Sequence, residues 1–202
     1  PQHIEWTHLT GAMILRQPYW QMGRLELGDA KQMPWLLLVR NFHATLRSAY
    51  FQARDRVKVF QGTPSEFLRS PEFGVIKLVT FYNIWTQQAR DKVARWNVFS
   101  YENVLADPTG QLTQILEALD LPIRDNWVKA VVAESSFDRM KELGLSPFYV
   151  GTPLAPTDVN RPETYKVRQG GTKHDLFTDE DETYIDRVVD DLFIAKNESA
   201  FA

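Results

Sequence analysis

The stretch Trp35-Leu36-Leu37-Leu38-Val39-Arg40-Asn41 decides the fold class. An uninterrupted apolar run between Pro34 and an arginine is typical of a strand buried on both faces, and such strands belong to parallel sheets covered by helices. Asn41 can cap a helix, and apolar residues then recur at helical spacing up to Ala53. Strand, tight turn and helix in this order predict an α/β fold.

The segments around this unit extend the same pattern. A second core strand is predicted at Trp96–Tyr101, and a further strand at His3–Leu9. Short helices are expected within the loop 11–34 and at 64–68, and a long amphipathic helix at 75–93. The sequence therefore predicts a mostly parallel central sheet flanked by helices.

Most of the predicted elements in the second half of the chain are helices. Asp107-Pro108 is an N-cap followed by a first-turn proline, and it leads into an apolar stripe that ends before Pro122. Further helices are predicted at 127–132 and at 137–143, the latter closed by Gly144. A long loop over 144–173 precedes the last helix, which begins at a capping box formed by Thr178 and Asp181 and runs to Leu192. Neither an internal repeat nor a second domain is apparent, so residues 1–202 are expected to form one domain.

Composition excludes several classes of function. The chain has 202 residues, 23 Lys and Arg, 26 Asp and Glu, and a net charge of −3, which disfavours a dedicated nucleic-acid binder. Without cysteine, disulfides and thiolate chemistry are excluded. No apolar run is long enough to span a membrane, and the four histidines are scattered, so neither a membrane span nor a metal site is expected.

Two stretches are candidates for binding an anion. Arg40 follows the carboxyl end of a buried strand, where ligands bind in open α/β sheets, and Ser48 adds a hydroxyl donor eight residues later. The alternative is an arginine paired with a carboxylate and a serine that faces solvent. Arg168-Gln169-Gly170-Gly171 combines a charge with glycines that let backbone N–H groups approach an anion, or it is a surface turn.

Two other residues can be placed by chemistry. His8, at the end of the first predicted strand, could serve as a general base near neutral pH, or it is a structural histidine. Tyr101 ends the second core strand, and its simplest interpretation is a ring in the core with a solvated hydroxyl.

Taken together, the chain resembles the sulfotransferases that use 3′-phosphoadenosine 5′-phosphosulfate (PAPS). The resemblance extends from about residue 4 to 193. It rests on five segments in the family's order: Trp6-Thr7-His8-Leu9; Leu38-Val39-Arg40-Asn41 with Ser48-Ala49-Tyr50-Phe51; Ser100-Tyr101-Glu102 through Asp107-Pro108; Ser136-Phe137-Asp138-Arg139-Met140; and Val167-Arg168-Gln169-Gly170.

The resemblance implies a P-loop NTPase-like α/β fold and transfer of a sulfuryl group from PAPS to an acceptor hydroxyl or amine, without a metal. It implies that His8 is the general base and that Tyr101 lies near the adenine. The 3′-phosphate would be held by Arg40 and Ser48 and by the loop residues Arg168, Gln169 and Gly170.

The sequence also departs from the family pattern. Trp6 and Gln169 stand where the family has lysine, and Phe42-His43-Ala44 replaces Pro-Lys-Asp. The family's strand–loop–helix that wraps the 5′-phosphosulfate lies upstream of the histidine strand, so it would precede Pro1. We therefore expect an N-terminally incomplete sulfotransferase-like domain.

Two other hypotheses about the function are compatible with the sequence. One is a non-catalytic nucleotide-binding or interaction module of the same fold that lacks the 5′-phosphosulfate loop. The other is a P-loop kinase, which is disfavoured because the sequence contains no G-x-x-x-x-G-K-S/T loop. For the favoured enzyme, the expected acceptor is a small molecule or a carbohydrate and the expected location is the cytoplasm.

Overall fold

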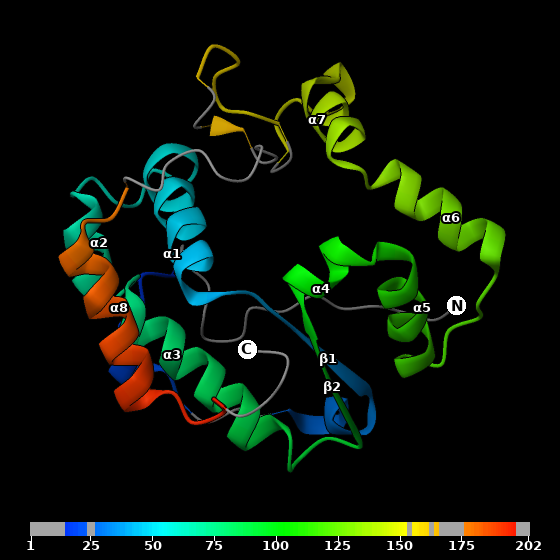
Figure 1. Cartoon of the computed structure of the whole chain (residues 1–202), viewed down its shortest axis with the longest axis horizontal. Coiled ribbons are helices and arrows are strands. Elements are labelled where there is room, and N and C mark those ends of the chain that lie inside the picture. Colours follow the sequence, from blue (N-terminus) through cyan, green and yellow to red (C-terminus); the bar gives the residue numbers. More distant parts are fainter. Residues whose placement is uncertain (1–14, 24–26, 153–154, 162–163, 166–175, 197–202) are drawn as a thin grey trace.

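The computed structural model describes residues 15–23, 27–152, 155–161, 164–165 and 176–196 (Figure 1). The strand predicted at His3–Leu9 lies outside these residues. None of the helices within the described ranges is both long and apolar enough to cross a membrane.

Two parallel strands confirm the predicted α/β class. Strand β1 (Pro34–Val39) pairs with β2 (Arg95–Ser100), with Pro34 opposite Arg95 and Val39 opposite Ser100. Within the described residues the sheet has these two strands only. The expected burial of β1 on both faces is wrong at Leu38, which is 48% exposed. The helical core covers the opposite face, where Leu37 and Val39 are buried.

Helices account for most of the remaining described chain. The α-helices are α1 (Phe42–Phe51), α2 (Pro64–Arg69), α3 (Val75–Asn83), α4 (Tyr101–Ala106), α5 (Pro108–Ala118), α6 (Asp125–Glu134), α7 (Phe137–Leu145) and α8 (Asp179–Leu192). Wider π-helical turns extend α1 through η4 (Gln52–Arg56) and α3 through η5 (Ile84–Ala89). Short 3₁₀ helices are η2 (Tyr19–Gln21), η3 (Gly28–Gln32) and η6 (Pro147–Tyr149).

The capping residues begin helices where the sequence predicted. The Asn41 side chain accepts a hydrogen bond from the Ala44 amide at 3.2 Å, and Asp107 accepts one from Gly110 at 2.9 Å. Thr178 and Asp181 form the expected capping box of α8. Each cap satisfies amides that lack a partner in the first helical turn.

Three predicted boundaries are wrong. The long helix over 75–93 is regular only to Asn83 and its π-helical extension ends at Ala89. Helix α7 runs through Gly144 to Leu145. Tyr101 begins α4 instead of ending a strand, because the Ser100 hydroxyl caps that helix by accepting from the Asn103 amide at 3.1 Å.

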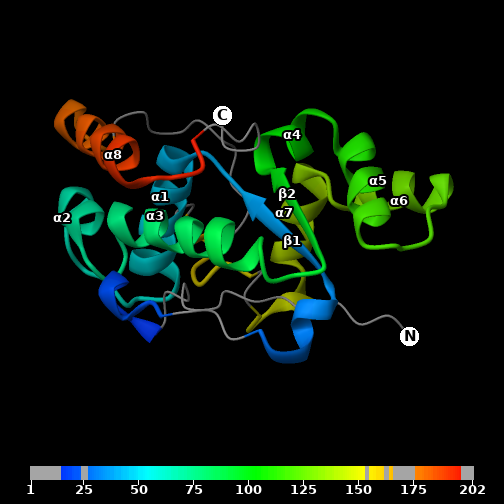
Figure 2. The ribbon, with the colours of Figure 1, turned by 90° about the horizontal axis from the view of Figure 1, so that it is seen from below.

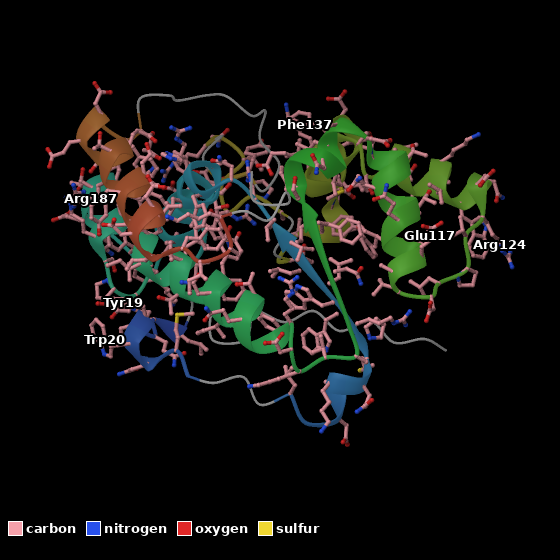
Figure 3. All side chains as sticks on the ribbon, turned by 60° about the horizontal axis from the view of Figure 1, so that its bottom comes forward. Tyr19, Trp20, Glu117, Arg124, Phe137 and Arg187 are labelled. Carbon is pink, nitrogen blue, oxygen red and sulfur yellow. The ribbon has the colours of Figure 1, made fainter. Side chains whose placement is uncertain are left out.

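The helices form two groups on either side of the strands. Figures 1 and 2 show α1, α2, α3 and α8 on one side, and α4, α5 and α6 on the other. Figure 3 shows Arg187 of α8 at one end of the molecule and Arg124, just before α6, at the other. The first group carries the core: Leu46, Val75, Val79 and Ile185 are each at most 1% exposed. Helix α5 buries no residue, and α6 buries only Val128.

Lys77 is a charged residue within this core. Its side chain belongs to α3, only 5% of the residue is exposed, and Nζ has no hydrogen-bond partner within the described part of the chain. Burial lowers the pKa of the amine, and the nearby Glu72 partly opposes that shift. Because the folded protein releases this proton at lower pH than the unfolded chain, stability should rise as pH increases toward the ordinary lysine pKa.

We expect Lys77→Met to raise the free energy of unfolding at pH 7 by about 1 kcal/mol, which corresponds to about 2–4 °C in Tm, because it removes a buried unpaired charge. The variant should also lose the rise in stability that accompanies the increase of pH toward the ordinary lysine pKa. Thermal and urea unfolding across this pH range measure both effects. Lys129→Met, at an exposed position of α6, is the matched control and should change little. A loss of stability in Lys77→Met would contradict this interpretation.

Candidate anion-binding site

The candidate site lies where both strands end. Because Val39 of β1 is opposite Ser100 of β2, the residues that follow these two positions come together at one edge of the sheet. Arg40 and Asn41 follow β1 and lead into α1, while Tyr101 begins α4 after β2. This carboxyl edge is where ligands bind in open α/β sheets.

Arg40 contacts both of the other predicted site residues within the described chain. Its Nη1 donates a hydrogen bond to the Ser48 hydroxyl at 3.2 Å. Its Cζ lies 4.7 Å from the centroid of the Tyr101 ring, within the range of a cation–π contact. Ser48 reaches Arg40 because it lies about two helical turns along α1, which begins directly after the strand.

Among the described residues, no carboxylate forms an ion pair with Arg40. Its Nε is buried and, among the same residues, has no hydrogen-bond acceptor. A buried donor without an acceptor is costly, so this arrangement suits an anion and disfavours the alternative of a structural ion pair.

Two side chains form hydrogen bonds with the peptide group that joins Arg40 to Asn41. The Asn41 amide donates to Glu102 Oε1 at 3.1 Å, and the Thr45 hydroxyl donates to the Arg40 carbonyl at 3.4 Å. The buried Tyr82 of α3 lies near this turn. Burial raises the pKa of its phenol, while hydrogen bonds with the Arg40 backbone and the Thr45 side chain lower it.

The sequence patterns do not indicate Glu102 or Thr45 as site residues. Glu102 lies in the segment Ser100-Tyr101-Glu102, but the resemblance assigns it no role. Thr45 lies in the first turn of a predicted helix, where nothing in the pattern distinguishes it. The predicted site residues His8, Arg168, Gln169 and Gly170 lie outside the described residues.

Comparison with known proteins identifies the family. The sequence matches the family model of the sulfotransferase domain over residues 30–197. The chain belongs to the sulfotransferase family. The matched range includes Arg40, Ser48 and Tyr101, whereas His8 precedes it. A search of the curated proteins found no significant match.

A solved structure supports the sulfotransferase fold. The mouse sulfotransferase SULT7A1, solved in complex with PAP, matches this chain with a TM-score of 0.58 at 17% sequence identity. The match covers 78% of this chain and 57% of the mouse protein, so the chain corresponds to little more than half of that relative. At this identity the likeness shows the fold, which is the mixed α/β architecture predicted from the sequence.

The cap at Asn41 gives a test of how the Arg40 turn is built. We expect Asn41→Ala to lower the free energy of unfolding by about 1 kcal/mol, because it leaves the Ala44 amide without its acceptor. Urea denaturation measures the change. Asn41→Ser keeps a capping oxygen and should retain most of the stability, so equal losses in both variants would argue against the cap.

Proposed function

We propose that this protein binds PAPS and transfers its sulfuryl group to a hydroxyl or amine of an acceptor. The observation that carries the proposal is the group formed by Arg40, Ser48 and Tyr101 at the carboxyl edge of the sheet, with an arginine that no described carboxylate neutralises. Membership of the sulfotransferase family supports the nucleotide of PAPS as the ligand that we propose for this group.

In this proposal Arg40 and Ser48 hold the 3′-phosphate of the nucleotide. A guanidinium offers a planar fork of donors that matches phosphate oxygens, and the serine hydroxyl can add a neighbouring donor. The contact between Arg40 and Ser48 orients the fork before the ligand arrives, which reduces the entropy lost on binding. The N-terminus of α1 lies at the same edge and also favours negative charge. Tyr101, beside the guanidinium, is proposed to lie near the adenine.

The proposal also assigns roles to residues that lie outside the part of the chain described by the structure. Arg168, Gln169 and Gly170 are assigned to the same phosphate, through one charge and through backbone N–H groups. PAPS supplies the sulfuryl group, and His8 is proposed to take the proton of the acceptor, a type of assistance worth about 10²–10⁴-fold in rate. No metal is invoked, the acceptor is proposed to be a small molecule or a carbohydrate, and the proposed location is the cytoplasm.

Calorimetric titration with PAP, the desulfated product of PAPS, tests the proposed contacts to the 3′-phosphate. We expect Arg40→Ala to weaken PAP binding by about 100-fold, since charge-assisted hydrogen bonds are lost, and Ser48→Ala to weaken it by about fivefold. The matched control is Arg95→Ala. Arg95 is an exposed arginine at the amino end of β2, where it pairs with Asp120, and its removal should leave PAP affinity unchanged.

Either of two results would refute the nucleotide site: a folded wild-type protein that does not bind PAP, or an Arg40→Ala variant that binds as tightly as wild type. Binding of PAP without any transfer of sulfate would instead favour the non-catalytic module of the same fold.

A transfer assay tests the role of His8. We expect His8→Ala to abolish transfer of radiolabelled sulfate from PAPS to a panel of phenols and amino sugars, because no base remains for the acceptor proton. The same variant should bind PAP with the affinity of wild type, measured by calorimetry. Transfer that survives the substitution would remove His8 from this role.

A further inference from the structure

Glu182 of α8 joins two residues of the neighbouring helix α1 (Figure 1). Its Oε1 accepts a hydrogen bond from Nη2 of Arg47 at 2.5 Å, and its Oε2 contacts Nδ1 of His43. The other ring nitrogen of His43 lies 2.8 Å from Oδ1 of Asp186, one turn further along α8. His43 and Arg47 are four residues apart, so they lie on the same face of α1. Glu182 thus uses both of its carboxylate oxygens on a single face of this helix.

We propose that Glu182 is a positioning residue that sets the rotation of α1 about its axis and so holds Ser48 at hydrogen-bond distance from Arg40. This inference rests on the proposed function, in which Arg40 and Ser48 bind the 3′-phosphate of the nucleotide. It adds to that function a residue of α8, an element that carries none of the predicted site residues.

The geometry of α1 connects the contacts of Glu182 to the site. Ser48 follows Arg47 directly in the chain, and successive residues of an α-helix are about 100° apart around its axis. The direction in which Arg47 and His43 are held therefore also determines the direction in which Ser48 points. Ser48 in turn accepts the hydrogen bond from Nη1 of Arg40.

The apolar contacts of α1 define its rotation less closely than these polar contacts do. Helix α1 buries Phe42 and Leu46 in the core, and hydrophobic burial has no directional preference. The bonds with Glu182 involve charged groups and are directional. The hydrogen bond between Arg40 and Ser48 is 3.2 Å long, at the upper end of the usual range, so a small rotation of the helix is enough to break it.

Charge and positioning predict opposite effects when Glu182 is removed. A carboxylate repels the phosphates of PAP, so by charge alone Glu182→Ala would tighten PAP binding. Loss of the contacts with His43 and Arg47 would instead allow Ser48 to leave Arg40 and would weaken PAP binding. The direction of the change in affinity therefore separates the two effects.

A double-mutant cycle tests the inference. We expect Glu182→Ala to weaken PAP binding about threefold in calorimetric titration, less than Ser48→Ala does, because Glu182 acts on the phosphate only through Ser48. In the Ser48→Ala background the same substitution should not weaken PAP binding further. A general loss of packing would weaken binding equally in both backgrounds. That result, or an unchanged or tighter affinity of Glu182→Ala in the otherwise wild-type protein, would overturn the inference.

Glu180→Ala is the matched control. Glu180 also lies in the first turn of α8, and its ion pair is with Arg69 of α2 at 3.7 Å. This variant removes the same charge from the same end of the helix and leaves the bonds between Glu182 and α1 in place. PAP affinity should not decrease. A decrease equal to that of Glu182→Ala would count against a specific role.

A second variant keeps the test decisive if Glu182→Ala does not fold. His43→Ala removes the contacts of α1 with Glu182 and Asp186 from the other side. It should weaken PAP binding about twofold in the otherwise wild-type protein and not at all in the Ser48→Ala background. No effect, or an equal effect in both backgrounds, would overturn the inference. Failure of the wild-type protein to bind PAP would refute the proposed function itself, a result distinct from any difference between variants.

Discussion

The site depends on one constraint: two parallel strands end at the same level, so the turns that follow them share one edge. Strand register places Val39 opposite Ser100, and the next residues are Arg40 and Tyr101. Their contact, with Cζ of the arginine 4.7 Å from the ring centroid, follows from this alignment. A shift of the register by one residue would reverse the faces of the strand and separate the two side chains. The apolar face that holds β1 on the helical core therefore also fixes the geometry of the site.

The two groups of helices make unequal contributions to this arrangement. Helices α1, α3 and α8 supply the buried core that supports β1, and Ser48 and Thr45 both come from α1. Helix α8 is held against this group by polar contacts, since the buried Asp181 accepts from Ser65 at 2.5 Å and from Arg69 at 2.6 Å. By contrast, α5 and α6 bury almost nothing. Support for Arg40 thus comes mainly from the well-packed side.

Much of the fold could be predicted because local chemistry marks its parts. Asn41, Asp107 and Thr178 cap helices through side-chain oxygens, and the apolar run before Arg40 forms a strand of the expected parallel kind. The errors have local causes as well. The pattern predicts that the second strand includes Tyr101, because aromatic residues are common in strands. In the structure the strand ends one residue earlier, since the Ser100 hydroxyl caps α4. Periodicity continued the helix of residues 75–93 too far, because apolar spacing alone does not show where the hydrogen-bond pattern widens.

The sequence by itself determined the α/β class, the family and the three described residues of the candidate site, since each is marked by a residue type at a characteristic place in the chain. Only the tertiary structure decided which polar groups support Arg40. Glu102 lies 62 positions beyond Arg40, and its hydrogen bond with the Asn41 amide follows from how α4 begins beside the end of β1. An exposed glutamate in a first helical turn is an ordinary solvated residue by pattern. It becomes part of a site only when folding brings the backbone amide of a distant residue within hydrogen-bond distance.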